Sequence, residues 1–256
     1  MMIYGIKILN TVVFCHGMPG SEADAELLRQ TNPDAKIIAL PLLDAVSENL
    51  DLGIQNAFDA ALDQAGESQV HLVGFSIGTM VAIKLAAMRP ENVSQLSLIS
   101  AAAPLSLGNF LPKMAGKPVF DLAMKHPKLL RLLTWFQGAI VRVSPNTLIK
   151  MLFANSGPRE KELLTDPSFT EILIQGLSAS LVRRSASYIA YVLAYVTDWS
   201  DTLHRVKSPV TLWHGTKDTW SPPEMAEELE RVFGQKTTVN LVEDAEHYST
   251  LKAALL

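Results

Sequence analysis

The stretch Gly74-Phe75-Ser76-Ile77-Gly78 directly follows the apolar run Val70-His71-Leu72-Val73 and precedes a helix-forming segment. A strand that leads through Gly-x-Ser-x-Gly into a helix is typical of a nucleophile elbow, in which the serine lies on a sharp, strained turn. The glycines fit such a turn because a side chain at either position would crowd it. Because this pattern also occurs by chance, its interpretation depends on the rest of the chain.

A reactive serine needs a general base and an acid that orients the base. The strand-like run 209–214 leads into Gly215-Thr216-Lys217-Asp218, and the run 237–242 leads into a loop that ends in His247. We expect Asp218 to be the acid and His247 to be the base, because each follows a strand. Three other acids compete for the same role, namely Asp198, Asp201 and Asp244.

The reaction also needs donors for the developing oxyanion. The loop His16-Gly17-Met18-Pro19-Gly20 follows the strand-like run 11–15 and can turn a backbone N–H toward the same sheet edge. Pro19 has no N–H. We therefore expect the donors to be the backbone amides of Met18 and Ile77, the latter being the residue after the nucleophile.

With these motifs in the order Ser76, Asp218, His247, the chain resembles the α/β-hydrolase family, of the kind with a His-Gly-x-Pro-Gly oxyanion loop and a helical lid. The resemblance covers the layout of nearly the whole chain. It implies Ser76 as nucleophile, Asp218 and His247 as its catalytic partners, and Met18 and Ile77 as the oxyanion hole.

The chain departs from the common family pattern at three places. Thr79 follows Gly78, where many members have a second glycine, and Glu246 precedes His247, where glycine is frequent. The loop after the strand 36–40 reads Pro41-Leu42-Leu43-Asp44 instead of Asp-x-x-Gly. Glu246 thereby puts an extra carboxylate beside the expected base, His247.

Composition excludes several classes of protein. The 256 residues are 48% hydrophobic and 19% charged with a net charge of −4, which is unlike a disordered chain, and no basic block indicates nucleic-acid binding. The single cysteine, Cys15, excludes an internal disulfide and lies in an apolar run typical of an inert thiol. No metal-binding spacing or phosphate-binding glycine loop occurs, so we expect no metal and no cofactor.

The beginning of the sequence shows no secretory signal, because its first nine residues carry one basic residue and no cleavage site follows an apolar core. No apolar stretch reaches the roughly 18 residues of a membrane-spanning helix. We expect a cytoplasmic protein without stable membrane association, acting on a small-molecule acyl substrate.

Alternating patterns predict a mostly parallel sheet flanked by helices, an α/β fold. Strands are expected at 3–9, 12–15, 35–40, 70–75, 96–100, 209–214 and 237–242. Helices are expected at 22–30, 52–66 and 77–88. Residues 104–208 show no strand pattern and are punctuated by prolines, which predicts a helical lid inserted into a core of residues 1–103 and 209–256.

Two segments of the expected lid carry apolar side chains. The segment 128–143 places polar residues at helical spacing, which predicts one polar face, and Tyr188, Tyr191, Tyr195 and Trp199 share another helix face. Both could line an apolar pocket or simply pack the lid onto the body. Packing is the commoner use of such stripes.

The sequence favours a serine hydrolase that cleaves an ester or related acyl bond through an acyl-enzyme. Four alternatives stay open. The same residues could act on a thioester, lactone, amide or C–C bond, or transfer the acyl group. The protein could bind a ligand on this fold without catalysis, or act as an interfacial lipase through the segment 128–143.

Overall fold

One parallel sheet forms the centre of the molecule. The computed structural model describes residues 11–46 and 49–256, and within these ranges six strands pair in the order β2-β1-β3-β4-β5-β6. The strands are β1 (Val12–Cys15), β2 (Ile37–Ala39), β3 (Val70–Phe75), β4 (Val93–Ile99), β5 (Val210–Gly215) and β6 (Thr237–Val242). The predicted sheet is confirmed, and the expected strand at 3–9 lies outside the described residues.

Burial follows the position of each strand in the sheet. Every residue of β1 and β3 is buried, as expected for central parallel strands that helices cover on both faces. The edge strand β6 is half-exposed instead. β4 begins at Val93, before the apolar run at 96–100 that the sequence shows. The polar residues Ser94 and Gln95 interrupt the apolar pattern in this first part of the strand.

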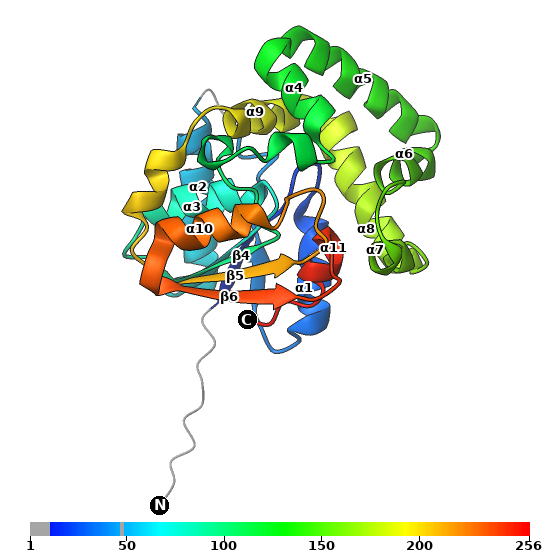
Figure 1. The fold of residues 1–256 in the computed structure, drawn as a ribbon. Helices are drawn as coiled ribbons and strands as arrows, with labels where there is room; N and C mark the ends of the chain where they lie inside the picture. The colour runs from blue at the N-terminus through cyan, green and yellow to red at the C-terminus, as the bar shows by residue number, and fades with distance from the viewer. Residues whose placement is uncertain (1–10, 47–48) are drawn as a thin grey trace, which may run out of the picture.

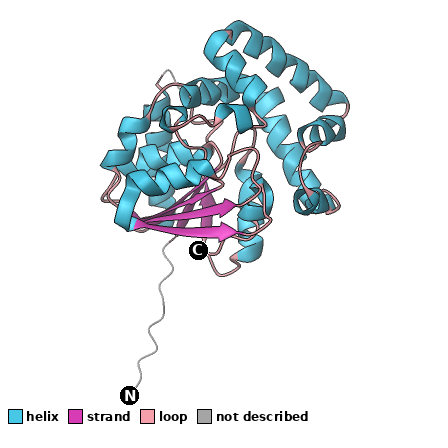
Figure 2. Ribbon diagram, viewed as in Figure 1, coloured by secondary structure: helices cyan, strands magenta, loops and turns pink. Residues whose placement is uncertain are grey.

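Helices flank the sheet on both sides (Figures 1 and 2). α1 (Ala25–Thr31) and α11 (His247–Leu251) lie on one side, and α2 (Leu50–Ala65), α3 (Gly78–Met88) and α10 (Glu224–Phe233) lie on the other. A short 3-10 turn, η1 (Glu22–Asp24), precedes α1.

The strand order places the candidate site. β1 lies between β2 and β3. The connection after β1 leads to β2 on one side, whereas the connection after β3 leads to β4 on the other side. Ligands of open α/β sheets bind at such switch points, beyond the carboxyl ends of the strands. The expected oxyanion loop follows β1 and Ser76 follows β3, so both begin at this point.

Helical elements connect β4 to β5, in agreement with the prediction of a strand-free segment. They are η2 (Leu105–Leu107), η3 (Leu111–Lys113), α4 (Lys117–Lys125), α5 (Pro127–Val143), α6 (Pro145–Leu152), α7 (Pro158–Leu163), α8 (Pro167–Ser178), the π-turn η4 (Ala179–Arg183), α9 (Ser185–Val196) and η5 (Ser200–Arg205). A proline stands in the first turn of α4 to α8, where its missing N–H costs no hydrogen bond. We call residues 104–208 the helical insertion; that it forms a separate lid remains a proposal.

The aromatic stripe of α9 mainly packs the insertion onto the core. Tyr191 and Tyr195 are fully buried, and their hydroxyls donate to the carbonyl oxygens of Leu42 (2.9 Å) and Ala103 (3.1 Å). Buried tyrosine hydroxyls need such partners. The stripe therefore serves packing at these two positions.

Candidate active site

Ser76 stands at the carboxyl end of β3 in a strained backbone conformation. Its φ is 55°, in the left-handed region that residues other than glycine rarely adopt. The flanking glycines are required by close packing: a Cβ on Gly74 would lie 2.7 Å from the Cα of Thr79, and one on Gly78 would collide with the carbonyl oxygen of Cys15. Strain of this kind is concentrated at functional sites, where the surrounding packing maintains it.

The expected oxyanion loop lies against the serine. A Cβ on Gly17 would lie 3.0 Å from the Cβ of Ser76, which shows how closely the two segments approach. Neither the Met18 nor the Ile77 amide donates a hydrogen bond to any residue in the described ranges. His16 Nδ1 donates to the carbonyl oxygen of Gly17 (2.9 Å) and so holds the loop from within. Both amides are thus available to a ligand oxygen.

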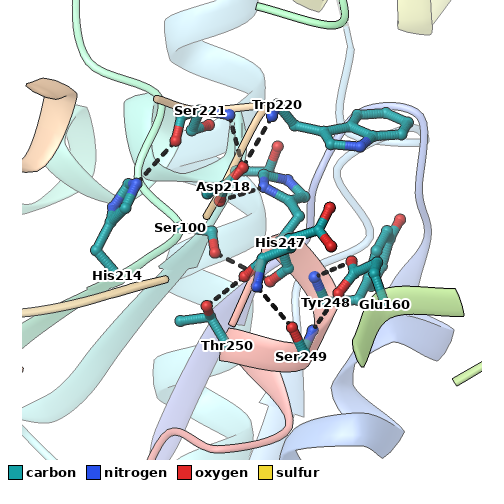
Figure 3. A network of polar contacts seen from close by, with 12 residues as sticks. Ser100, Glu160, His214, Asp218, Trp220, Ser221, His247, Tyr248, Ser249 and Thr250 are labelled. Carbon is teal, nitrogen blue, oxygen red and sulfur yellow. Dashed lines mark hydrogen bonds and ion pairs between the residues drawn. The ribbon is translucent and has the colours of Figure 1, made fainter. Parts of the chain in front are cut away.

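Asp218 and His247 form a buried pair at the ends of β5 and β6 (Figure 3). His247 Nδ1 lies 2.8 Å from Asp218 Oδ2, with side-chain exposures of 2% and 0%. The other carboxylate oxygen accepts the backbone N–H groups of Trp220 and Ser221, each at 2.9 Å. Because Nδ1 faces the carboxylate, Nε2 remains the nitrogen that can accept a proton.

The surroundings of Asp218 favour its charged form. Burial acts to raise the pKa of this carboxyl, but the interaction with His247 and the hydrogen bonds around it outweigh burial and lower the pKa. An ionised Asp218 can fix the orientation of the imidazole and stabilise an imidazolium. His214 supports the same loop, since its Nε2 lies 2.8 Å from the carbonyl oxygen of Ser221.

The imidazole of His247 is held beside the elbow. Its ring packs at 4.9 Å from that of Phe75, the residue before Ser76, and stacks on Trp220 at 5.7 Å. In the described structure no hydrogen bond joins Ser76 Oγ to His247. Such bonds often tighten only when a substrate is bound. The imidazole therefore contacts the residue next to Ser76, and a direct contact with the serine hydroxyl stays a prediction.

The rival acids lie elsewhere. Asp198 accepts hydrogen bonds from Ser106 Oγ (2.7 Å) and the Ser200 amide (3.0 Å), and Asp201 is exposed. Asp244 occupies a left-handed turn with φ 55° and is exposed. Asp218 is thus the acid among the four candidates that the fold brings to His247.

The extra carboxylate beside the base, that of Glu246, is bound to the helical insertion. Glu246 Oε1 accepts the Gly157 amide (2.6 Å) at the start of α7. In return, Glu160 of α7 accepts the amides of Tyr248 (2.6 Å) and Ser249 (3.0 Å) in the first turn of α11. We call these contacts the carboxylate clamp. It joins the helical insertion to the loop that carries His247.

Glu160 was not foreseen in the sequence. It is fully buried, and burial raises the pKa of its carboxyl while the two amides oppose that effect. It binds Tyr248 and Ser249, which lie 88 and 89 positions later in the sequence, so no local pattern indicates its role. The proline at the start of α7 was the available signal, because it marks a helix whose first turn holds this acid.

A second contact joins the insertion to the oxyanion loop. Ser180 Oγ accepts the Gly20 amide (3.0 Å) and donates to the Gly20 carbonyl oxygen (2.9 Å), and the serine is fully buried. It lies in the π-turn η4, a distortion that is frequent at functional sites. Both loops that flank Ser76 are therefore fixed by the insertion.

An apolar cavity of about 320 Å³ opens beside the candidate oxyanion donors. Met18, Ile77 and Trp220 line it from the core, while Tyr188 and Leu133 line it from the helical insertion. This volume lies within the range of small-molecule sites, at about 300 to 1,000 Å³. Its walls suit an apolar group, and Tyr188 is the member of the α9 stripe that lines it.

The described part of the chain offers no grouping of three histidine, cysteine or acidic side chains that could hold a metal ion. Cys15 is buried, and burial raises the pKa of its thiol far above its usual range, so the thiol is not poised to react. Over the same residues, no helix is both long and apolar enough to cross a membrane.

Comparisons with known proteins agree on the family. The sequence profile of the family described as alpha/beta hydrolase fold matches residues 51–254. No curated protein matches the sequence. Solved structures do match, among them an esterase, RhEst1, from Rhodococcus sp. (TM-score 0.65, 19% identity, covering 93% of this chain and 84% of that one). MenH from S. aureus gives a TM-score of 0.62 at 17% identity, covering 97% and 90%.

A third similar structure is Est816, described as an N-acyl homoserine lactone degrading enzyme (TM-score 0.64, 17% identity, covering 95% of this chain and 88% of that one). At these identities the structural likeness shows the fold alone. The profile match spans most of the chain and supports a hydrolase. The chain belongs to the alpha/beta hydrolase fold family.

Proposed function

We propose that this protein is a serine hydrolase that cleaves an ester or related acyl bond of a small, partly apolar substrate. The observation that carries the proposal is the buried 2.8 Å contact between Asp218 and His247 beside the strained Ser76. This arrangement supplies a nucleophile, a base and an orienting acid without a cofactor.

The first half of the reaction forms an acyl-enzyme. Ser76 Oγ attacks the substrate carbonyl carbon while His247 Nε2 takes the hydroxyl proton. The amides of Met18 and Ile77 hold the oxyanion, and the loss of one such donor typically costs about 3 kcal/mol of transition-state stabilisation. His247 then gives its proton to the departing alcohol oxygen as the C–O bond breaks.

The second half releases the acid. A water molecule loses a proton to His247 and attacks the acyl carbon, after which Ser76 takes the proton back as the acyl–oxygen bond breaks. The adjacent cavity would hold the apolar part of the substrate against Met18, Leu133 and Tyr188. The walls of this cavity therefore set the preference for substrate size.

A panel of p-nitrophenyl esters of graded chain length, with a matched thioester, lactone and amide, tests the proposal. We expect the ester to react fastest, with a maximum at an intermediate chain length that the cavity accommodates. Ser76→Ala is expected to lose essentially all activity, whereas Ser106→Ala, at an exposed serine, retains it. Full activity in Ser76→Ala would contradict the proposal, and preference for another bond type would redefine the substrate.

A further inference from the structure

One face of α5 exposes large apolar side chains to solvent. Five of them are between 49% and 88% exposed: Leu129, Leu132, Trp135, Phe136 and Val143. We call these five residues the α5 outer face. Of the polar residues that the sequence places on one face of this helix, Lys128, Arg131 and Arg142 are exposed, whereas Thr134 is buried and donates to the Leu130 carbonyl oxygen (2.9 Å).

The helix therefore has two apolar faces. Leu130, Gly138 and Val141 pack inward, where α5 contacts α8, α9 and η4. Leu129, Leu132 and Phe136 recur at spacings of 3 and 4 on the opposite side. Figure 1 shows α5 along the outer margin of the molecule, far from the sheet. Clustered exposed apolar residues of this kind mark interaction sites.

The same region is strongly basic. Residues 104–158 carry seven lysines and arginines and one acid, Asp121, although the whole chain has 22 basic and 26 acidic residues. Lys128, Arg131 and Arg142 lie on α5 itself and are exposed. None of these three forms an ion pair with a residue in the described ranges. A helix with tryptophan, phenylalanine and leucine beside free basic residues fits the surface of an anionic bilayer.

The α5 outer face also borders the cavity of the candidate site. Leu133 and Gln137, which follow Leu132 and Phe136, line the cavity from α5. Met151 of α6 is 59% exposed and lines it as well. The outer face and the cavity are therefore adjacent on α5.

We propose that the α5 outer face docks reversibly on an anionic lipid bilayer, with Trp135 and Phe136 in the interfacial region and Lys128, Arg131 and Arg142 against the headgroups. The site would then take acyl esters dissolved in that bilayer; this second statement rests on the proposed hydrolase function, whereas the docking does not. The sequence predicts no stable membrane association, and a reversible docking is compatible with that prediction.

A symmetric contact between two copies is a poorer fit for this face. It would bring the basic groups of one copy against the same groups of the other, and like charges at short range repel. A bilayer with anionic headgroups provides the opposite charge along the whole face.

Vesicle sedimentation tests the docking with the full chain. We expect binding to vesicles of phosphatidylcholine with 30% phosphatidylglycerol, little binding to phosphatidylcholine alone, and release in 0.5 M salt, because screening weakens the headgroup contacts. The double variant W135S/F136S should bind at least about tenfold more weakly. Its matched control is Leu241→Ser, at a similarly exposed leucine on β6.

The charges are tested separately. Replacing Lys128, Arg131 and Arg142 by glutamine should weaken binding about 100-fold, at about fivefold for each residue. The control replaces Arg205, Lys207 and Lys217, which are exposed basic residues outside this region. Equal losses in both triple variants, or no binding of the wild type, would overturn the proposal. A dimer that W135S/F136S abolishes, without vesicle binding, would assign the face to a second copy instead.

Separate measurements distinguish a failure of the membrane docking from a failure of the proposed hydrolase function. Ser76→Ala should bind vesicles as the wild type does, because the docking uses no catalytic group. The wild type should hydrolyse an ester embedded in anionic vesicles faster than W135S/F136S does, while both cleave a soluble short-chain ester equally. Intact vesicle binding with no hydrolysis of any ester would refute the hydrolase function and leave the docking standing.

Discussion

The strand-end loops of the core carry the reactive groups of the candidate site, whereas the helical insertion fixes where those loops lie. Ser76, Asp218 and His247 follow three strands of one sheet, and their conformations depend on nearby residues such as Gly74 and Gly78. Glu160 and Ser180 contribute no reacting atom, yet they bind the loops through buried hydrogen bonds. The comparison predicts large catalytic effects for the core and smaller, positional effects for the insertion.

The largest expected effect comes from the core. Asp218→Asn should lower kcat by about 10⁴-fold, because the amide no longer holds His247 in the required tautomer. The measurement is steady-state kinetics on the best ester, with Asp244→Asn as the control at an exposed acid of a neighbouring loop. A loss of less than tenfold would show that Asp218 is not the orienting acid.

The insertion should have an intermediate effect. Glu160→Gln keeps one acceptor for the α11 amides but places an NH₂ group against the other, so about 1.4 kcal/mol and tenfold in kcat should be lost. KM should change little, because Glu160 does not line the cavity.

Glu162→Gln serves as the control for this variant, because Glu162 is an exposed acid on the same helix. Thermal unfolding of all three proteins separates loss of fold from loss of position. A tenfold loss in Glu162→Gln, or none in Glu160→Gln, would contradict a positional role for the carboxylate clamp.

The smallest effect on activity is expected at the junction of the two regions, where the substitution acts on the pH dependence of stability. Asp24 is fully buried behind the oxyanion loop, and the nearby backbone N–H groups of Gly17 and Ser21 only partly offset the burial of its carboxyl. Burial raises the pKa of this group well above its usual range. It lines a void of about 10 Å³ together with Leu173 and Gly176 of the insertion.

The sign of the resulting pH dependence follows from that shift. The folded protein holds the Asp24 proton to higher pH than the unfolded chain does, so stability falls as pH rises above about 4, the usual carboxyl pKa. Asp24 thus contributes a decrease of at most about 1.4 kcal/mol in the free energy of unfolding per pH unit, and this contribution should vanish in Asp24→Asn. Urea unfolding at pH 4.5, 6 and 7.5 measures it, with Asp63→Asn as an exposed control. Parallel curves for wild type and Asp24→Asn would contradict the assignment.

Sequence patterns predicted the core far better than the insertion. The elbow, the strand that precedes it and the strand end that precedes Asp218 depend on short motifs, in which each residue constrains neighbours only a few positions away. The prolines at the starts of the insertion helices were equally readable. Whether Ser76, Asp218 and His247 act as a triad stays a prediction, although the fold brings them to one sheet edge.

The remaining features depend on contacts that no local pattern encodes. Ser180 meets Gly20 across 160 positions of sequence, and Glu160 meets Tyr248 across 88. The sequence pattern of α5 is incomplete for a related reason. Helical periodicity identifies two faces but not which neighbour covers each, and here Thr134 faces inward while Trp135 faces solvent.

The central claim is that the imidazole of His247 activates Ser76, and the rate of labelling by a fluorophosphonate tests it most directly. We expect rapid labelling of the wild type, with the adduct on the peptide that contains Ser76, and labelling at least about 10³-fold slower in His247→Ala. An adduct on another residue, or equal rates in the wild type and His247→Ala, would contradict the account.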